Sequence, residues 1–229
     1  MKIKTADGTS LHIERYGNGV PLFLLHGNHQ SNKIFMRQIH LLSGDFMLIS
    51  VDSRGHGGSE HGDSPLSLDL LAEDIIEIAN QLSLSHFGII GFSDGANIAL
   101  NIGMKVPSRI TGLFLISPND NEKGLKTRFR VPLKSLIRLL TPFKMFFYIR
   151  RFQEKLRLMM EKLSLDTTIL TMPILIVAGK HDIIHTHHHE SLANNLTNAT
   201  YIRLKQMGHF SLPSGELNEL LFDFFISKS

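Results

Sequence analysis

The 229-residue chain contains no cysteine, which excludes both disulfide bonds and a thiol nucleophile. It also lacks any run of roughly 18 apolar residues, the length that a membrane-spanning helix requires. Residues 1–8 have no apolar segment of the kind found in signal peptides. We therefore expect a cytoplasmic protein.

No internal repeat, low-complexity tract or linker rich in Pro, Gly or Ser divides the chain into independent units. An apolar content of 42% with 20% charged residues is typical of a soluble globular protein rather than a disordered one. A chain of this length can bury a sizeable core as one α/β domain with an insertion. We expect neither a cofactor nor a nucleic-acid partner.

Short apolar segments alternate along the chain with segments of helical period. Strands are predicted at 2–5, 11–16, 21–26, 47–52, 87–91, 112–117, 174–178 and 201–204. The first two alternate polar and apolar residues around Asp7-Gly8, which predicts an antiparallel hairpin at a sheet edge. The later segments are apolar throughout, as strands buried on both faces must be.

Helices are predicted between these strands, at 31–42, 67–83, 95–105, 187–196 and 215–227. Alternating strands and helices with continuously apolar strands are typical of a parallel sheet that is covered on both sides. The pattern therefore predicts an α/β protein with a mostly parallel eight-stranded sheet and helices on both faces.

Residues 119–165 interrupt this alternation because they contain no buried strand. They hold 12 Lys+Arg against 4 Asp+Glu, a balance of +8, whereas the rest of the chain has a balance of −5. The same stretch is rich in large apolar residues. We predict a helical insertion over the sheet, with a basic outer face and an apolar inner face. Met145, Met159 and Met160, with Met104 outside the insertion, are candidates for lining a flexible pocket, although methionine more often fills a core.

The pentapeptide Gly91-Phe92-Ser93-Asp94-Gly95 lies between an apolar strand and a helix of small residues. In this context a serine sits on a sharp strand-to-helix turn that exposes its hydroxyl. A Cβ at either glycine would collide with the neighbouring strand or helix. Ordinary loops before helices also contain such pentapeptides by chance, but the flanking elements favour Ser93 as a nucleophile.

A serine hydroxyl needs a base, usually a histidine that a carboxylate orients. In strand-turn-helix hydrolases the order along the chain is Ser, then Asp or Glu, then His. Asp182 follows the strand predicted at 174–178, and His209 follows the strand at 201–204. Both side chains then lie at the carboxyl ends of strands, where the active sites of parallel sheets collect. Asp120, after an earlier strand, is the alternative acid.

Acyl transfer also needs backbone N–H groups that stabilise the oxyanion of the substrate. The segment His26-Gly27-Asn28 ends a buried strand, and its glycine lets the backbone turn an amide inward. We predict the N–H groups of Asn28 and Asp94 as the two donors. His26 is expected to brace this loop rather than to transfer protons.

Together these motifs resemble the α/β-hydrolase family over nearly the whole chain, and they occur in the order typical of that family. The matched motifs lie at residues 26–27, 52–59, 91–95, 179–182 and 208–210. The resemblance implies Ser93 as nucleophile, Asp182 as orienting acid and His209 as base. It also implies a core of residues 1–118 and 166–229, with 119–165 as a helical cap inserted after the sixth strand. Dehalogenases and epoxide hydrolases of this fold use aspartate as the nucleophile, so Ser93 argues against both.

The predicted function is serine-dependent hydrolysis of a small, largely apolar carboxylic ester through an acyl-enzyme intermediate. C–C bond hydrolases, thioesterases and lactonases share the same apparatus and remain alternatives. So does a non-catalytic relative that binds a ligand or partner in the capped pocket, because a fold alone does not fix function. The sequence does not specify the oligomeric state.

Two further features carry weaker hypotheses. The histidines between His185 and Glu190 are possible zinc ligands, but adjacent side chains at 187–189 point in different directions, so we expect no metal. The basic insertion is compatible with peripheral membrane contact. A solvated outer face with a pocket-lining inner face is the favoured interpretation.

Overall fold

The computed structural model of the chain describes residues 1–210, 212 and 215–226. Eight strands are present: β1 (Lys2–Lys4), β2 (Ser10–Tyr16), β3 (Val20–Leu25), β4 (Phe46–Val51), β5 (Phe87–Phe92), β6 (Ile110–Ile116), β7 (Ile174–His181) and β8 (Ala199–Gly208). They form one sheet in the order β1-β2-β4-β3-β5-β6-β7-β8. All eight predicted strands are therefore confirmed, with ends that differ by up to four residues.

Neighbouring strands are parallel from β4 to β8, and only the pairs at the β1-β2 edge of the sheet are antiparallel. β1 pairs antiparallel with β2, with Lys2 opposite His12, and β2 pairs antiparallel with β4. The remaining neighbours pair in parallel. This confirms both the predicted edge hairpin and the mostly parallel sheet.

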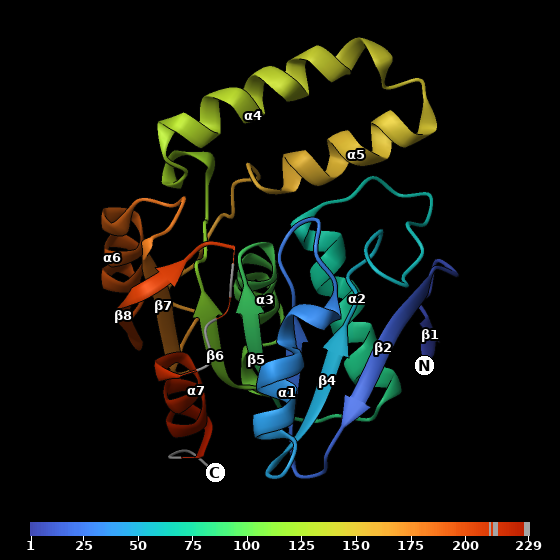
Figure 1. The fold of residues 1–229 in the computed structure, drawn as a ribbon. Helices are drawn as coiled ribbons and strands as arrows, with labels where there is room; N and C mark the ends of the chain where they lie inside the picture. Colours follow the sequence, from blue (N-terminus) through green and yellow to red (C-terminus); the bar gives the residue numbers. More distant parts are fainter. Residues whose placement is uncertain (211, 213–214, 227–229) are drawn as a thin grey trace.

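Helices cover both faces of the sheet (Figure 1). The described helices outside the insertion are η1 (Asn32–Phe35), α1 (Met36–Leu42), α2 (Leu68–Gln81), α3 (Asp94–Lys105), η2 (Pro107–Arg109), α6 (Thr186–Asn195) and α7 (Glu216–Ile226). One buried apolar cluster joins the sheet to α2, α3 and α6, and a second joins it to α1 and α7. All five predicted helices are present, although 31–42 divides into η1 and α1, and residue 227 lies outside the described residues.

The segment between β6 and β7, where the helical insertion is predicted, contains η3 (Glu122–Gly124), α4 (Thr127–Leu140), η4 (Thr141–Phe143) and α5 (Phe147–Leu158). Figure 1 shows α4 and α5 as a hairpin above the carboxyl ends of the strands, with α5 nearer the sheet. One hydrogen bond and one ion-pair contact hold α5 to the core: Arg151 donates to the Gly62 carbonyl at 2.5 Å, and the Glu154 carboxylate lies 3.1 Å from Nε2 of His61.

α4 rests on α5 rather than on the sheet. Gln153 of α5 donates hydrogen bonds of 2.8 Å to the Ile137 carbonyl and to Thr141. No residue of α4 is buried, and Leu139 is 66% exposed. The predicted apolar inner face is therefore only partly realised, because the outer helix has no sheet to pack against and leaves large apolar side chains in solvent.

Within the described residues, no helix combines the length and apolar character needed to cross a lipid bilayer.

Candidate active site

Ser93 is the single residue between the end of β5 and the start of α3, and its backbone is in a strained conformation. Its φ is 52° and its ψ is −118°, values that non-glycine residues rarely adopt. A Cβ at Gly91 would lie 2.5 Å from the Gly95 carbonyl oxygen, and one at Gly95 would lie 2.0 Å from that of Leu25. Both clashes predicted from the pentapeptide are present, so the turn requires glycine on each side of the serine.

Ser93, His209 and Asp182 form a continuous hydrogen-bonded chain. The Ser93 Oγ lies 3.1 Å from Nε2 of His209, and Nδ1 of His209 lies 2.7 Å from Oδ1 of Asp182. The three residues follow or end strands β5, β8 and β7, whose carboxyl ends meet at one edge of the sheet. All three side chains are at least nine-tenths buried, so the structure brings together the three residues that the order of motifs singled out.

Asp182 is held as a carboxylate by its hydrogen bonds. Burial alone would raise its pKa, but hydrogen bonds from His209, from the Ser117 hydroxyl and from the Ile184 amide lower that pKa to about 2. Ser117 donates to Oδ2 at 2.5 Å and the Ile184 N–H to Oδ1 at 2.9 Å. The carboxylate therefore stays charged and faces Nδ1–H of His209.

Ser117 is a site residue that the sequence analysis missed. It directly follows β6, so the rule that identified Asp182 and His209, a polar residue at a strand end, would also have identified it. Its own backbone has a φ of 54°, which aims the hydroxyl away from the run of the strand and toward Asp182.

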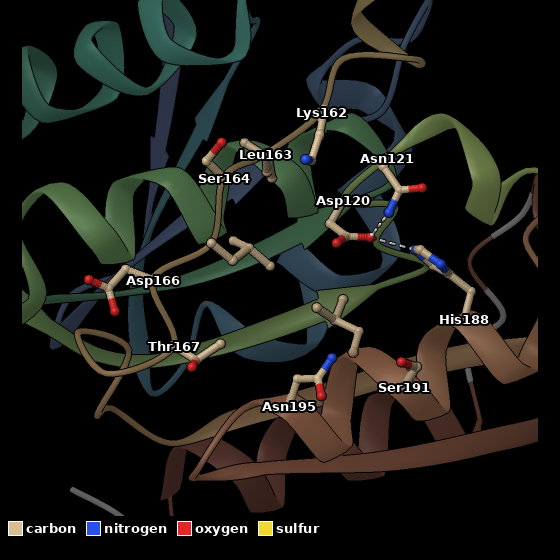
Figure 2. A pocket seen from close by; sticks show the side chains of 12 residues that line it. Asp120, Asn121, Lys162, Leu163, Ser164, Asp166, Thr167, His188, Ser191 and Asn195 are labelled. Carbon is tan, nitrogen blue, oxygen red and sulfur yellow. Dashed lines mark hydrogen bonds and ion pairs between the residues drawn. The ribbon is translucent and has the colours of Figure 1, made fainter.

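The alternative acid, Asp120, lies in a different place. Its Oδ1 is 2.7 Å from Nε2 of His188 and accepts a hydrogen bond from Asn121 at 2.9 Å. Figure 2 shows this pair at one end of an open, polar pocket of about 910 Å³ between α6 and the segment after α5. Asp120 therefore orients His188, while His209 is hydrogen-bonded to Asp182.

A smaller, mostly apolar cavity of about 390 Å³ opens beside Ser93. It is lined by Gly27, Asn28, His29, Gln30, Phe92, Ser93, Met159, His209 and Phe210. Met159, one of the four methionines considered as pocket candidates, therefore lines this cavity. Met145, by contrast, is 81% exposed, and Met104 packs against the core.

In the described part of the chain, the backbone N–H groups of Asn28 and Asp94 donate no hydrogen bond to a carbonyl or a side chain. The loop carrying Asn28 comes close to the nucleophile, since a Cβ at Gly27 would lie 3.1 Å from Cβ of Ser93. Donors without a partner beside a serine hydroxyl are available for the oxygen of a bound substrate.

His26 connects the same loop to the turn after β4. The Ser53 N–H donates to Nε2 of His26 at 3.0 Å, so its Nδ1 carries the proton and donates to the Gly27 carbonyl at 2.8 Å. Burial lowers the pKa of His26, which keeps the ring neutral in this bracing role.

The histidine-rich start of α6 does not gather metal ligands. Across the described residues, no three His, Asp or Glu side chains converge on one position. His188 faces Asp120, and His189 stacks near Tyr201 at 5.8 Å between ring centroids.

A strand-nucleophile-helix turn at the carboxyl end of a parallel sheet, with a Ser–His–Asp chain at the strand ends, defines the α/β-hydrolase class. The family model for the alpha/beta hydrolase fold matches residues 20–141. The chain belongs to this family.

Relatives and solved structures agree with this assignment. The chain is 36% identical over 136 residues to an uncharacterized hydrolase of Saccharomyces cerevisiae, covering 58% of this chain and 47% of that protein. It is 32% identical over 108 residues to a pimeloyl-[acyl-carrier protein] methyl ester esterase of Nitrosomonas europaea, covering 47% and 41%. The matches thus span less than half of these relatives.

The fold is also similar to that of an esterase from Exiguobacterium antarcticum, with a TM-score of 0.81 at 23% identity. That alignment covers 99% of this chain and 98% of the esterase.

Proposed function

We propose that the chain is a serine hydrolase that cleaves a small, largely apolar carboxylic ester through an acyl-enzyme intermediate. The observation that carries this proposal is the hydrogen-bonded chain Ser93–His209–Asp182 beside an apolar cavity of about 390 Å³. Burying a carboxylate is costly unless it is paired. A relative that only bound a ligand would gain nothing from burying the charged Asp182 behind a histidine.

In the proposed reaction, His209 removes the Ser93 proton as Oγ attacks the acyl carbonyl. Asp182 keeps Nδ1–H of His209 oriented and stabilises the imidazolium that forms. The N–H groups of Asn28 and Asp94 hold the oxyanion. His209 then protonates the alcohol that leaves, and a water molecule deprotonated by the same histidine attacks the acyl group and releases the acid.

The cavity supports a small apolar substrate. Phe92, Met159 and Phe210 contribute apolar surface around Ser93, and no Lys or Arg is among the described residues that line this cavity. One relative is named as a methyl ester esterase, which is compatible with a small alcohol as leaving group.

Residues 1–118 and 166–229 form the proposed catalytic core, with 119–165 as its cap. Met159, just after α5, contributes to the cavity wall, and Asn28 donates to the Lys155 carbonyl of α5 at 2.5 Å. The cap therefore touches both the proposed acyl site and the loop that carries one oxyanion donor, which supports a role in substrate selection.

The direct test is Ser93→Ala, assayed with p-nitrophenyl esters of graded acyl length. Removal of the nucleophile should lower kcat by at least about 10⁴-fold, while circular dichroism remains that of the folded protein. Ser85→Ala, which changes an exposed serine, is the matched control and should keep full activity. Retained ester hydrolysis in Ser93→Ala would reject the assignment.

A fluorophosphonate probe separates an active serine from an inert one without knowledge of the substrate. Mass spectrometry should locate a single adduct on the peptide that contains Ser93, and the adduct should be absent in Ser93→Ala. A panel that adds a thioester, a lactone and a carbon–carbon-cleavage substrate then decides among the chemistries that share this apparatus.

A further inference from the structure

The turn that joins α4 and α5 exposes a cluster of large apolar side chains. We call this cluster the cap tip, and it consists of Phe143, Met145, Phe146, Phe147 and Tyr148. Their exposed fractions run from 47% for Phe143 to 83% for Tyr148. Figure 1 shows this turn at the free end of the helical hairpin, beyond the part of α5 that is bonded to the core. A cluster of exposed apolar side chains of this kind marks an interaction surface.

The charge around the cap tip has one sign. From Lys123 to Gln153 the chain carries nine Lys+Arg and no Asp or Glu. Arg138, Lys144 and Arg150 are exposed close to the tip in sequence. The partner of this surface must therefore accept apolar side chains and carry negative charge.

These properties disfavour two of the usual occupants. A second copy of the chain that packed tip against tip would bring two equally basic surfaces together, and like charges at an interface are repulsive. A stable protein partner typically buries about 800 Å² on each side, whereas the cap tip is a cluster of five side chains at one protruding turn. An anionic lipid bilayer avoids both problems. It accommodates a few inserted side chains without a large interface, and it offers a continuous negative surface.

We propose that the cap tip docks the protein on an anionic lipid bilayer. The side chains of Met145, Phe146 and Phe147 enter the boundary between headgroups and acyl chains, and Tyr148 lies at the headgroup level that tyrosine favours. The surrounding lysine and arginine side chains bind the lipid phosphates. Neither the cavity beside Ser93 nor the hydrogen-bonded chain behind it takes part in docking.

Co-sedimentation of the full chain with vesicles tests this proposal. Vesicles of phosphatidylcholine alone are compared with vesicles that also contain phosphatidylglycerol, at low and at moderate ionic strength. The wild-type protein should bind the anionic vesicles, and added salt should weaken that binding because it screens the attraction. Ser93→Ala should bind as well as wild type.

Two variants separate the apolar component of binding from the electrostatic one. Met145→Ser combined with Tyr148→Ser should lower the partition coefficient for anionic vesicles by roughly tenfold or more. Lys144→Gln should lower it by about fivefold and reduce its salt dependence. The matched controls Met36→Ser, which changes a residue that is 49% exposed on α1, and Lys33→Gln should leave binding unchanged. All four proteins should keep wild-type activity toward a soluble ester.

Three outcomes would overturn the proposal. The first is a wild-type protein that stays in the supernatant with anionic vesicles at low salt. The second is binding that the cap-tip variants do not weaken relative to the controls. The third is a wild-type dimer, detected by sedimentation velocity, that the cap-tip variants convert to a monomer, since a second copy would then cover the tip.

Discussion

The side chains of Asn28 and Asp94 join the two residues whose backbone amides we propose as oxyanion donors. Nδ2 of Asn28 donates to Oδ2 of Asp94 at 2.7 Å, and the same amide group donates to the Lys155 carbonyl. This bond links the loop after β3 to the first turn of α3, and so it fixes the separation of the two amides. Each side chain therefore has a positioning role in addition to its backbone role.

Asp94 makes stability depend on pH in a defined direction. Burial raises the pKa of Asp94 to about 7, against the hydrogen bond from Asn28 that lowers it. In the unfolded chain the carboxyl ionises near its ordinary value of 3.8. The stabilisation from this group is therefore complete below about pH 4 and is lost as the pH rises through about 7.

Asp94→Asn removes this dependence because an amide stays neutral. Relative to wild type, the free energy of unfolding of Asp94→Asn should increase by about 2 kcal/mol or more between pH 4 and pH 8. Urea unfolding curves at several pH values measure this difference. Asp63→Asn, which changes an exposed aspartate, is the control and should show no such trend. A pH-independent difference between Asp94→Asn and wild type would mean that the pKa of Asp94 is not raised.

Site residues at strand ends are predictable from the sequence, whereas contacts between their side chains are not. Ser93 and His209 were predictable because each stands where a strand stops and a glycine-containing turn begins. The Ser117–Asp182 and Asn28–Asp94 bonds depend on which polar atoms the folded chain leaves adjacent. No spacing along the chain encodes that adjacency.

At the scale of whole elements, apolar segments located the strands but not their ends. β7 reaches His181 and β8 reaches Gly208, and these two residues are paired with each other. The backbone pairing of β7 with β8 thus continues through polar residues, beyond the apolar segments from which strands at 174–178 and 201–204 were predicted. The exposure of α4 was also unpredictable, because an amphipathic pattern shows that a helix has two faces and not which neighbour covers the apolar one.

The packing of α3 against β3 makes Gly95→Ala a test of the nucleophile turn. The added Cβ would meet backbone atoms, 2.0 Å from the Leu25 carbonyl oxygen and 2.7 Å from that of His26. Backbone cannot rotate away as a side chain can, so α3 must shift from the sheet. We expect a loss of about 3 kcal/mol in the free energy of unfolding, at the upper end of overpacking effects.

Gly44→Ala is the matched control, since a Cβ at this exposed glycine meets no atom within 4 Å. Its unfolding free energy should remain within about 0.5 kcal/mol of wild type. Urea unfolding of both variants gives the comparison. If Gly95→Ala were as stable as Gly44→Ala, the close approach of α3 to β3 would not be needed for the fold.

At the scale of the molecule, one buried arginine connects three distant segments. Arg54, 1% exposed, donates to Asp74 of α2 at 2.6 and 2.9 Å and to Asp7 of the edge hairpin at 2.6 Å. The hydrogen bond from Arg54 lowers the pKa of Asp7, which is partly exposed. Burial raises the pKa of the more enclosed Asp74 despite the same partner. The positive charge of Arg54 therefore mainly compensates the buried carboxylate of Asp74.

Arg54→Met should destabilise the whole domain by about 3–5 kcal/mol at neutral pH, because it leaves the Asp74 carboxylate buried and unpaired. The loss should be smaller near pH 5, where protonation of a carboxyl with a raised pKa becomes easier. Adding Asp74→Leu should recover most of the stability, since an apolar pair replaces a buried charge. Urea unfolding of the single and double variants at both pH values measures these effects. If the double variant were as unstable as Arg54→Met, the lost packing of the arginine side chain, rather than its charge, would be what joins the edge hairpin to α2.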